Sequence, residues 1–405
     1  MIQQALCLSI AGDEIVVAPG TYAENLQFCG PDVVLRSSDV RNPAAVASTI
    51  IDGGGAGPTV WFVGTETEAC LLSGFTIRNG KADYGGGIYG GAESKRTQAA
   101  IEHCMITGNW AKWGGGLMHC DGTIKNNRIT ANSSAEGGGG LYACDGKVQN
   151  NTIAGNSAGW CGGGLAYCDG AVWNNMITGN SADDSGGGLW ACDGTIYNNT
   201  ICANSAELEG GGLGYCSGAI LDCIVWGNSA PTGPQLQTSP AHAYSCIQGW
   251  TGEREGDIGL DPRFVDADGL DNNPATWQDN NYRLRADSPC IDAGKNEDWM
   301  QDALDLDGNP RIVYGRTSIT VDMGAYEYGS FSFRIVGIKK EGGGETNLLW
   351  SSRSGYVYVV WSCGDLLGGL WVEETTVPSN GSRMSWIDPR ATTIAKFYRI
   401  EMKKR

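Results

Sequence analysis

A block of 24 residues recurs through the middle of the chain without a change of period. One copy, residues 138–161, reads GGGLYACDGKVQNNTIAGNSAGWC. Its leucine, first cysteine and last asparagine return at every step, at Leu117, Leu141, Leu165, Leu189 and Leu213; at Cys120, Cys144, Cys168, Cys192 and Cys216; and at Asn132, Asn156, Asn180, Asn204 and Asn228. A fixed period of this length is typical of stacked units that share one continuous core.

The residue types of the block favour strands and turns over helices. Gly, Asn, Ser and Thr dominate, and the apolar positions, such as Val148 and Ile153, are brief and interrupted by turn residues. A propeller blade would need about 40 residues. We therefore predict an all-β fold, a right-handed parallel β-helix with 24-residue coils, in which equivalent residues stack about 4.8 Å apart.

The repeats and three segments outside them carry a family resemblance. The repeats, GGG with Leu or Ile and then G-N-S-A, resemble those of polymorphic outer-membrane proteins and of secreted bacterial β-helix proteins of the pectate-lyase-like superfamily. Residues 15–26 (IVVAPGTYAENL) resemble the first coil of such proteins. Residues 305–316 (DLDGNPRIVYGR) and 321–328 (VDMGAYEY) resemble the segment that closes the helix in bacterial choice-of-anchor secreted proteins. The resemblance implies the fold but not an activity, because this group contains lyases, hydrolases and adhesins.

The chain is expected to form two domains. Residues 1–330 read as the β-helix, with an N-terminal cap over about residues 1–20 and irregular C-terminal coils. Residues 331–405 alternate apolar and polar positions as in a small antiparallel β-sandwich-like module. Between Ile88 and Leu117 the step is 29 residues, so an insertion there predicts a lateral loop.

Charge limits the partners and the location. The net charge is −17, from 45 acidic and 28 basic residues, which argues against nucleic acid as a partner. No stretch is apolar and long enough to predict a membrane-spanning segment. Together with the resemblance, the acidic, Gly- and Asn-rich composition predicts a secreted or cell-surface protein.

The cysteine count is odd. A secreted chain with 15 cysteines leaves at least one of them unpaired. In-register side chains of the cysteine column point the same way, so we expect a stack of buried thiols there rather than disulfides. No C-x-x-C pair or histidine cluster in the sequence favours a metal site.

Recurring polar residues are expected to be scaffold. The asparagine columns predict amide ladders that satisfy buried backbone groups. A second polar column consists of aspartates, each followed by glycine: Asp121, Asp145, Asp169 and Asp193. Stacked carboxylates repel one another, so these must be exposed, hydrogen-bonded to turn amides or bridged by cations. Asp-Gly turn chemistry is the preferred interpretation, and a Ca²⁺ ladder is the alternative.

Function is expected where columns vary. One outward column runs through Lys125, Gln149, Trp173 and Tyr197. An exposed face of this kind indicates a contact surface. Trp173 and Tyr197 form a candidate platform for stacking sugars. The alternative, which we favour for this face, is a docking surface for residues 331–405.

The turn before each glycine triplet varies as well. Aromatic residues at Trp113 and Trp160 make it a candidate ligand-binding ridge. Acidic residues follow in later coils, and the candidate catalytic residues among them are Asp183, Asp184, Glu207 and Glu209. Adjacent coils place carboxylates about 5 Å apart and alternate coils about 10 Å apart, which permits a glycosidase pair. A solvated acidic row is the plainer interpretation.

Two other candidate sites stand apart from this ridge. A polyuronate lyase needs basic side chains, and because the sequence has no Lys or Arg between Lys147 and Arg254, its candidate residues are Lys125 and His119. The stretch with Asp266, Asp268 and Asp271 resembles a calcium loop without the remaining ligands of an EF-hand. It is the candidate site for a structural Ca²⁺ ion.

The sequence therefore predicts a non-catalytic extracellular or cell-surface β-helix protein with an adhesive, structural or glycan-contacting role. Polysaccharide or a cell-surface glycan is the expected partner, with self-association as a further mode and with no required cofactor. A polysaccharide-degrading enzyme, either a glycoside hydrolase or a polyuronate lyase, is the alternative.

Overall fold

The computed structural model describes most of the chain, and the chain divides into two compact units. The described residues are 1–273, 276–301, 303–312, 320–328, 335–340, 346–351, 356–364, 370–378, 383–388 and 396–404. One unit comprises Met1–Asp307 and Arg311–Tyr328, and the other comprises Gly308–Pro310 and Gly329–Arg405.

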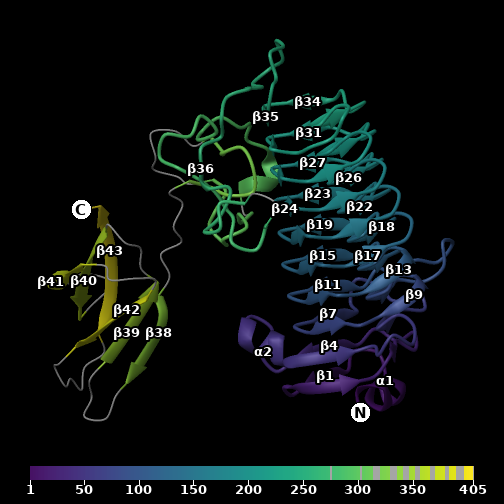
Figure 1. Ribbon diagram of the computed structural model, residues 1–405. Coiled ribbons are helices and arrows are strands. Elements are labelled where there is room, and N and C mark those ends of the chain that lie inside the picture. Colours follow the sequence, from purple (N-terminus) through teal and green to yellow (C-terminus); the bar gives the residue numbers. More distant parts are fainter. Residues whose placement is uncertain are drawn as a thin grey trace. The chain divides into compact units, whose positions relative to one another are not determined.

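The first unit is a β-helix whose coils stack in parallel register (Figure 1). Two of its sheets, named A and B, have ten strands each. Sheet A consists of β1 (Glu14–Val17), β4 (Val34–Ser37), β7 (Leu71–Ser73), β11 (Ala100–Glu102), β15 (Thr123–Lys125), β19 (Lys147–Gln149), β23 (Ala171–Trp173), β27 (Ile196–Tyr197), β31 (Ile220–Leu221) and β34 (His242–Ala243). Sheet B consists of β2 (Gly20–Ala23), β5 (Thr49–Asp52), β8 (Thr76–Arg78), β12 (Met105–Thr107), β16 (Arg128–Thr130), β20 (Thr152–Ala154), β24 (Met176–Thr178), β28 (Thr200–Cys202), β32 (Ile224–Trp226) and β35 (Cys246–Ile247).

Two further sheets complete the coils. Sheet C has nine strands: β3 (Leu26–Gln27), β6 (Val60–Trp61), β10 (Ile88–Tyr89), β14 (Leu117–Met118), β18 (Leu141–Tyr142), β22 (Leu165–Ala166), β26 (Leu189–Trp190), β30 (Leu213–Gly214) and β33 (Leu236–Gln237). Sheet D has six: β9 (Lys81–Tyr84), β13 (Trp110–Trp113), β17 (Ser133–Ser134), β21 (Ser157–Ala158), β25 (Ser181–Ala182) and β29 (Ser205–Ala206). The predicted all-β fold, a right-handed parallel β-helix of 24-residue coils, is confirmed.

The core follows the repeating apolar columns. Leu141, Cys144 and Ile153, like their equivalents in neighbouring coils, are fully buried. Leu141 and Cys144 are three residues apart, a spacing that simple strand alternation would send to opposite faces. Ala143 between them adopts a left-handed backbone (φ 46°), and this bend lets both side chains face inward. The cysteine column is therefore a stack of buried thiols, as predicted.

Amide ladders run along the inside of the corners. The Nδ2 group of Asn156 donates to Asn180 Oδ1 (2.9 Å) and to the carbonyl of Ile129 (2.9 Å). The backbone N–H of Asn156 also donates to Asn180 Oδ1 (3.0 Å). The same pattern links the whole Asn132 column, and a second ladder follows Asn127, Asn151, Asn175 and Asn199. The predicted ladders are confirmed, and they satisfy buried backbone groups as expected.

Glycine is required where the coils approach most closely. A Cβ atom on Gly139 would lie 2.5 Å from the carbonyl oxygens of both Gly163 and Ser157, which no side chain tolerates. The triplet therefore allows backbones of successive coils to pack against each other without intervening side chains.

The N-terminal cap is shorter than expected. Helix α1 (Ile2–Leu8) places Ile2 and Leu6 against the end of the core. Strand β1 then begins at Glu14, so the first coil starts before residue 20. Helix α2 (Pro43–Ser48) interrupts the second coil. No helix in the described residues is long and apolar enough to cross a membrane.

The later part of the unit folds back along the coils. It contains β36 (Phe264–Asp266), β37 (Asn281–Leu284) and the 3₁₀ helix η1 (Asp298–Gln301), and Figure 1 shows β36 and its neighbouring loops beside the coils. Phe264, Tyr282 and Met323 pack there with Met176 and Ile224 of sheet B. This segment therefore covers the outer side of several sheet B strands.

In its described residues, the second unit contains two three-stranded antiparallel sheets. Their orders are β38 (Ile335–Lys340), β39 (Thr346–Ser351), β42 (Arg383–Asp388) and β41 (Val372–Pro378), β40 (Tyr356–Cys363), β43 (Phe397–Lys404). Trp350 of one sheet and Tyr358 and Ile400 of the other share one apolar core. This arrangement confirms the predicted antiparallel, sandwich-like character of the C-terminal module.

Candidate functional site

An aromatic stripe runs along sheet C and the turns that precede it. We define it by six residues, four in one ring-contact group and two in a second: Trp113, Tyr142, Trp160 and Tyr167, and then Trp190 and Tyr215. Trp113 lies 5.0 Å from Tyr142 and 6.2 Å from Trp160, measured between ring centroids. Tyr142 lies 5.6 Å from Tyr167, and Trp190 lies 4.7 Å from Tyr215. Trp113 and Trp160, two of the predicted ligand-binding residues, are thus brought together.

The stripe depends on an exchange of large and small residues between two columns. The first column holds the second residue of each sheet C strand: Met118, Tyr142, Ala166, Trp190 and Gly214. The second holds the left-handed residue that follows: His119, Ala143, Tyr167, Ala191 and Tyr215. Because a bulky residue in one column is paired with a smaller one in the other in most coils, rings from successive coils fit beside each other.

One glycine shows how tight this fit is. A Cβ atom on Gly214 would lie 2.7 Å from the ring of Trp190. The absent side chain at Gly214 therefore makes room for Trp190, while Tyr215 in the same coil supplies the next ring of the stripe.

The stripe is accessible along its length. Trp160 and Tyr215 are each 40 % exposed, and Trp113, Tyr142, Tyr167 and Trp190 are half-buried. Near its N-terminal end, Tyr89 has ring contacts with Trp61 and Tyr84 at 6.2 and 6.1 Å. The stripe is therefore a row of partly exposed aromatic rings, and it is the candidate contact surface of the coils.

Carboxylates occupy the turns of two later coils that are equivalent to the turns at Trp113 and Trp160. Asp183 and Glu207 are exposed and occupy equivalent positions in consecutive coils. Asp184 accepts a hydrogen bond from Ser185 Oγ, and Glu209 accepts one from Gln237 Nε2 (2.9 Å). Two of the four candidate carboxylates are thus exposed, and the other two accept hydrogen bonds from neighbouring side chains.

The side chains of the aspartate column accept hydrogen bonds from backbone amides of the next coil. Asp145 N–H donates to Asp121 Oδ1 (2.9 Å), and the same contact links Asp169 to Asp145 and Asp193 to Asp169. Burial raises the pKa of Asp121 and of Asp169. The carboxylates of this column are therefore hydrogen-bonded to turn amides, one of the arrangements that the sequence allowed.

The predicted insertion forms the lateral loop between β10 and β11, and it anchors the aspartate column. Arg96 of this loop forms ion pairs with Glu93, Asp121 and Asp145. The Arg96 guanidinium hydrogen-bonds to Glu93 and lowers the pKa of that carboxyl. The loop therefore supplies the positive charge that offsets stacked carboxylates near the start of the column.

The two lyase candidates are held apart by different partners. His119 is buried, with Nδ1 2.8 Å from the carbonyl of Gly91 and Nε2 3.0 Å from Glu93 Oε2. Lys125 lies in sheet A and pairs with Glu102 (3.1 Å) of the preceding coil. Each of the two side chains is therefore paired with a carboxylate of its own.

The face at Trp173 and Tyr197 is in register, as predicted, but the chain itself covers part of it. Trp173 stacks on Trp299 of η1, with ring centroids 4.9 Å apart and planes at 21°. Burial raises the pKa of Tyr197, and Glu297 contributes to the rise. We expected a sugar or residues 331–405 to occupy this face. The segment before residue 328 occupies it at Trp173, because it offers a matching ring.

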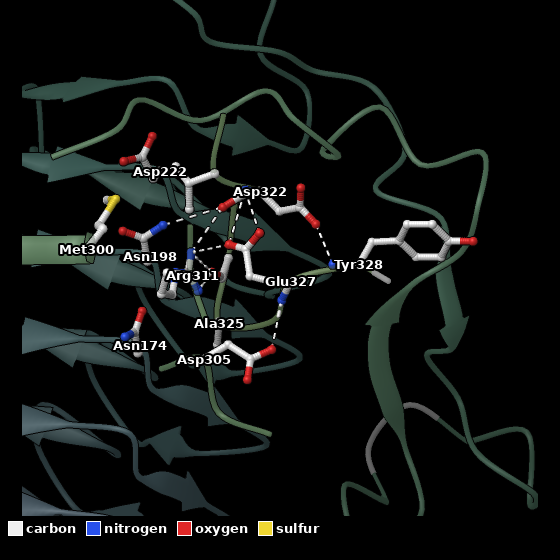
Figure 2. A network of polar contacts seen from close by, with 12 residues as sticks. Asn174, Asn198, Asp222, Met300, Asp305, Arg311, Asp322, Ala325, Glu327 and Tyr328 are labelled. Atoms are coloured by element: carbon white, nitrogen blue, oxygen red, sulfur yellow. Dashed lines mark hydrogen bonds and ion pairs between the residues drawn. The ribbon is translucent and has the colours of Figure 1, made fainter. Parts of the chain in front are cut away.

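A buried polar network fixes that segment to the coils (Figure 2). Arg311 is buried and donates to the carbonyls of Asp322 (3.1 Å) and Gly324 (3.0 Å), and it pairs with Glu327 (3.2 Å). Asp305 accepts the backbone N–H of Glu327 (3.0 Å). The described parts of the two motifs at 305–316 and 321–328 are therefore structural; positions 313–316 lie outside the described residues.

The coils present a polar column to this network. Asn150 and Asn174 donate to the carbonyl of Leu304 at 3.2 and 3.1 Å, and Asn198 donates to the carbonyl of Asp322. Asp222 ends the column, and its Oδ1 accepts the backbone N–H of Lys295 (2.7 Å). Burial raises the pKa of Asp222 to about 7. Sequence reasoning did not single out this column, because its partners lie about 75 to 155 residues away.

The carboxylates of the aspartate stretch that begins at the end of β36 do not converge on one point. Asp271 Oδ1 accepts the backbone N–H of Asn273 (3.0 Å), a local turn contact. Within the described ranges, no group of three or more His, Cys, Asp or Glu side chains is placed to hold a metal ion. The structure therefore does not bring Asp266, Asp268 and Asp271 together as a calcium site.

Fold and surface together define a β-helix protein that carries a row of partly exposed aromatic rings on successive coils. Residues 9–216, just over half of the chain, match the family model described as periplasmic copper-binding protein (NosD). The chain belongs to this family. A comparison with curated proteins found no match. We expected a secreted or cell-surface protein, and the family description is consistent with a secreted or cell-envelope location but not specifically with the cell surface.

Copper has a clear ligand preference that can be compared with these residues. It favours thiolate, thioether and imidazole ligands that converge on one point. The thiols of the cysteine column instead stand side by side, and Cys120 donates to the carbonyl two residues before it, as do its equivalents. His103, His119 and His242 contact separate partners: Asn126, Gly91 with Glu93, and Asp257. In the part of the chain that the structure describes, the residues do not fit a copper site.

Proposed function

We propose that this chain is a non-catalytic periplasmic β-helix protein that binds a polysaccharide along the aromatic stripe. The continuous ring contacts from Trp113 to Tyr167, continued by Trp190 and Tyr215, are the observation that carries the proposal. The location follows from the family description.

The chemistry of the stripe suits a sugar chain. The C–H faces of a pyranose pack on aromatic rings, and its hydroxyls donate hydrogen bonds to carboxylates. The stripe supplies rings and the adjacent turns supply Asp183 and Glu207. Because the coils repeat about every 4.8 Å, a linear polysaccharide that lies along the β-helix axis meets similar contacts in successive coils.

The acidic residues near the stripe limit the classes of polysaccharide that can bind there. Residues 148–253 contain no Lys or Arg, and they include Asp183, Asp184, Glu207 and Glu209. A polyuronate would meet like charges along this surface, which disfavours its binding. We therefore infer that the ligand is a neutral polysaccharide or one that carries amino sugars.

A glycoside hydrolase is the second candidate. Its support is the placement of Asp183 and Glu207 at equivalent positions of consecutive coils, a separation near that of a retaining pair. This activity predicts release of reducing ends from the bound polysaccharide, abolished by Asp183→Asn and by Glu207→Gln.

Affinity electrophoresis tests the proposal. The purified chain is run through gels that contain a neutral glucan, chitosan or polygalacturonate. Retardation by the glucan or by chitosan, with none by polygalacturonate and without release of reducing ends, supports the proposal. Retardation by polygalacturonate alone, or by no polysaccharide of a broad panel, contradicts it.

A further inference from the structure

The two exposed cysteines of the chain face each other. Of the 15 cysteines, 13 are buried, and only Cys7 and Cys29 are exposed. Their Sγ atoms lie 3.6 Å apart, at the distance of van der Waals contact. Cys7 belongs to helix α1, and Cys29 follows strand β3 of the first coil. Exposed thiols are rare in this chain, so the meeting of these two calls for an explanation.

The spacing of helix and strand explains why the thiols meet. Gln3 and Cys7 are four residues apart on α1, a rise of about 6 Å along one face. Gln27 and Cys29 are two residues apart in an extended segment, a step of about 6.6 Å on the same side. The buried residues Leu26 and Phe28 alternate with them, so Gln27 and Cys29 face outward.

Polar contacts hold the two segments in this register. Gln3 Oε1 accepts the backbone N–H of Gln27 (2.6 Å), and Gln3 Nε2 donates to the Gln27 carbonyl (3.0 Å). Glu24 accepts the backbone N–H groups of Ile2 and Gln3 at 3.1 and 2.9 Å. With the backbones fixed at one end of the pair, side-chain rotation alone can bring the two sulfurs to bonding distance.

We propose that Cys7 and Cys29 form a disulfide that pins the cap helix to the first coil. Such a disulfide requires an oxidising compartment. The periplasm, the location given in the proposed function, is oxidising. The proposal does not depend on glycan binding. It leaves the 13 buried cysteines as thiols.

The bond forms by two thiol–disulfide exchanges with a disulfide oxidant, such as a disulfide-carrying oxidoreductase or oxidised glutathione. One cysteine thiolate attacks a sulfur of the oxidant and expels a thiolate, giving a mixed disulfide. The second cysteine thiolate then attacks the protein sulfur of that mixed disulfide and expels the other thiolate. The two thiol protons and two electrons end on the reduced oxidant, so the exchange balances.

The consequence lies at the open end of the β-helix. Strands β1, β2 and β3 are the terminal strands of their sheets and leave one edge without a strand partner. Unpaired edges invite strand addition by another chain. Helix α1 lies against the first coil, contacting β1 and β3, so a covalent link at Cys7 keeps this cover in place.

Peptide mapping of the full chain tests the link. After incubation with oxidised glutathione, native labelling with a maleimide should fall from two thiols to none, and a cross-linked peptide pair containing Cys7 and Cys29 should appear. In Cys7→Ser and in Cys29→Ser, the remaining exposed cysteine should carry a glutathione instead. Separate glutathionylation of both cysteines in the wild type, without a cross-link, would overturn the proposal.

Hydrogen exchange tests the pinning. Exchange of the α1 amides should slow on oxidation of the wild-type chain and should not respond to oxidant in the double variant Cys7→Ser/Cys29→Ser. Equal exchange in the oxidised and reduced wild type would show that the bond, even if formed, does not hold the cap.

Discussion

At the scale of single residues, the proposed binding surface can be tested at its tryptophans. Trp160 is 40 % exposed and in ring contact with Trp113, so its free face is available to a ligand. Trp110 is 39 % exposed, and it contacts the ammonium group of Lys81 rather than another ring of the stripe. The two tryptophans therefore have similar exposure and different surroundings.

This difference gives a matched pair of variants. Trp160→Ala should weaken polysaccharide binding about tenfold, since a stacked aromatic anchor commonly contributes more than about 1 kcal/mol. Trp110→Ala should leave binding unchanged. Dissociation constants from affinity electrophoresis provide the measurement, and equal effects of the two substitutions would count against the stripe.

Asp222 gives the fold a pH dependence. Burial raises the pKa of its carboxyl to about 7, above the value of about 3.9 in an unfolded chain. The protonated form is therefore the one favoured in the fold. The stability that Asp222 contributes to the fold is fully present below about pH 4 and is lost as the pH rises through about 7.

Asp222→Asn should remove that loss. The amide keeps an oxygen for the backbone N–H of Lys295 and carries no charge at any pH. Because of Asp222, the free energy of unfolding of the wild type should fall by up to about 4 kcal/mol, relative to that of the variant, between about pH 4 and pH 8. Urea unfolding at several pH values measures the difference. Parallel pH profiles for the two proteins would be inconsistent with a buried carboxyl.

At the scale of elements, the recurring columns were predictable and the stripe was not. Leu141, Cys144 and the asparagine ladder could be placed from period alone, because equivalent residues of stacked coils meet their own copies. The side on which Tyr142 and Tyr167 face depends on the left-handed residue between the leucine and the cysteine. An alternating strand pattern does not reveal that bend, so the rings could not be assigned to one surface.

The ladder itself is open to test. Asn180→Ala would leave the backbone N–H of Asn156 without its acceptor and would remove one hydrogen bond to the carbonyl of Ile153. A buried, unsatisfied N–H group should lower the free energy of unfolding by about 2 kcal/mol. Ser181→Ala, on the next residue, should change it by less than about 0.5 kcal/mol. Equal losses in the two variants would show that the ladder contributes little.

At the scale of the whole molecule, both ends of the β-helix carry covers. Helix α1 lies at the N-terminal end, and the segment after β35 adds backbone contacts at the other, where Ile258 pairs with Cys246. Stacking of copies end to end is therefore disfavoured. Sedimentation velocity should find a monomer, and a concentration-dependent series of longer species would contradict this expectation.

At this scale, contacts between residues that are distant in the sequence could not be predicted from it. Residues 21–80 show little of the 24-residue pattern, yet their strands continue sheets A, B and C in register. The contact of Trp299 with Trp173 joins positions about 125 residues apart, which no local pattern encodes. The resemblance of residues 305–328 to a helix-closing segment indicated their structural role, although not the face that they cover.

A glycan array read with two forms of the chain tests the central claim most directly. The wild type should bind neutral or amino-sugar polysaccharides, and the double variant Tyr142→Ala/Trp160→Ala, with an unchanged circular dichroism spectrum, should lose those signals. Wild-type binding that persists in the variant, or that is confined to polyuronates, would contradict the assignment of the aromatic stripe as the ligand surface.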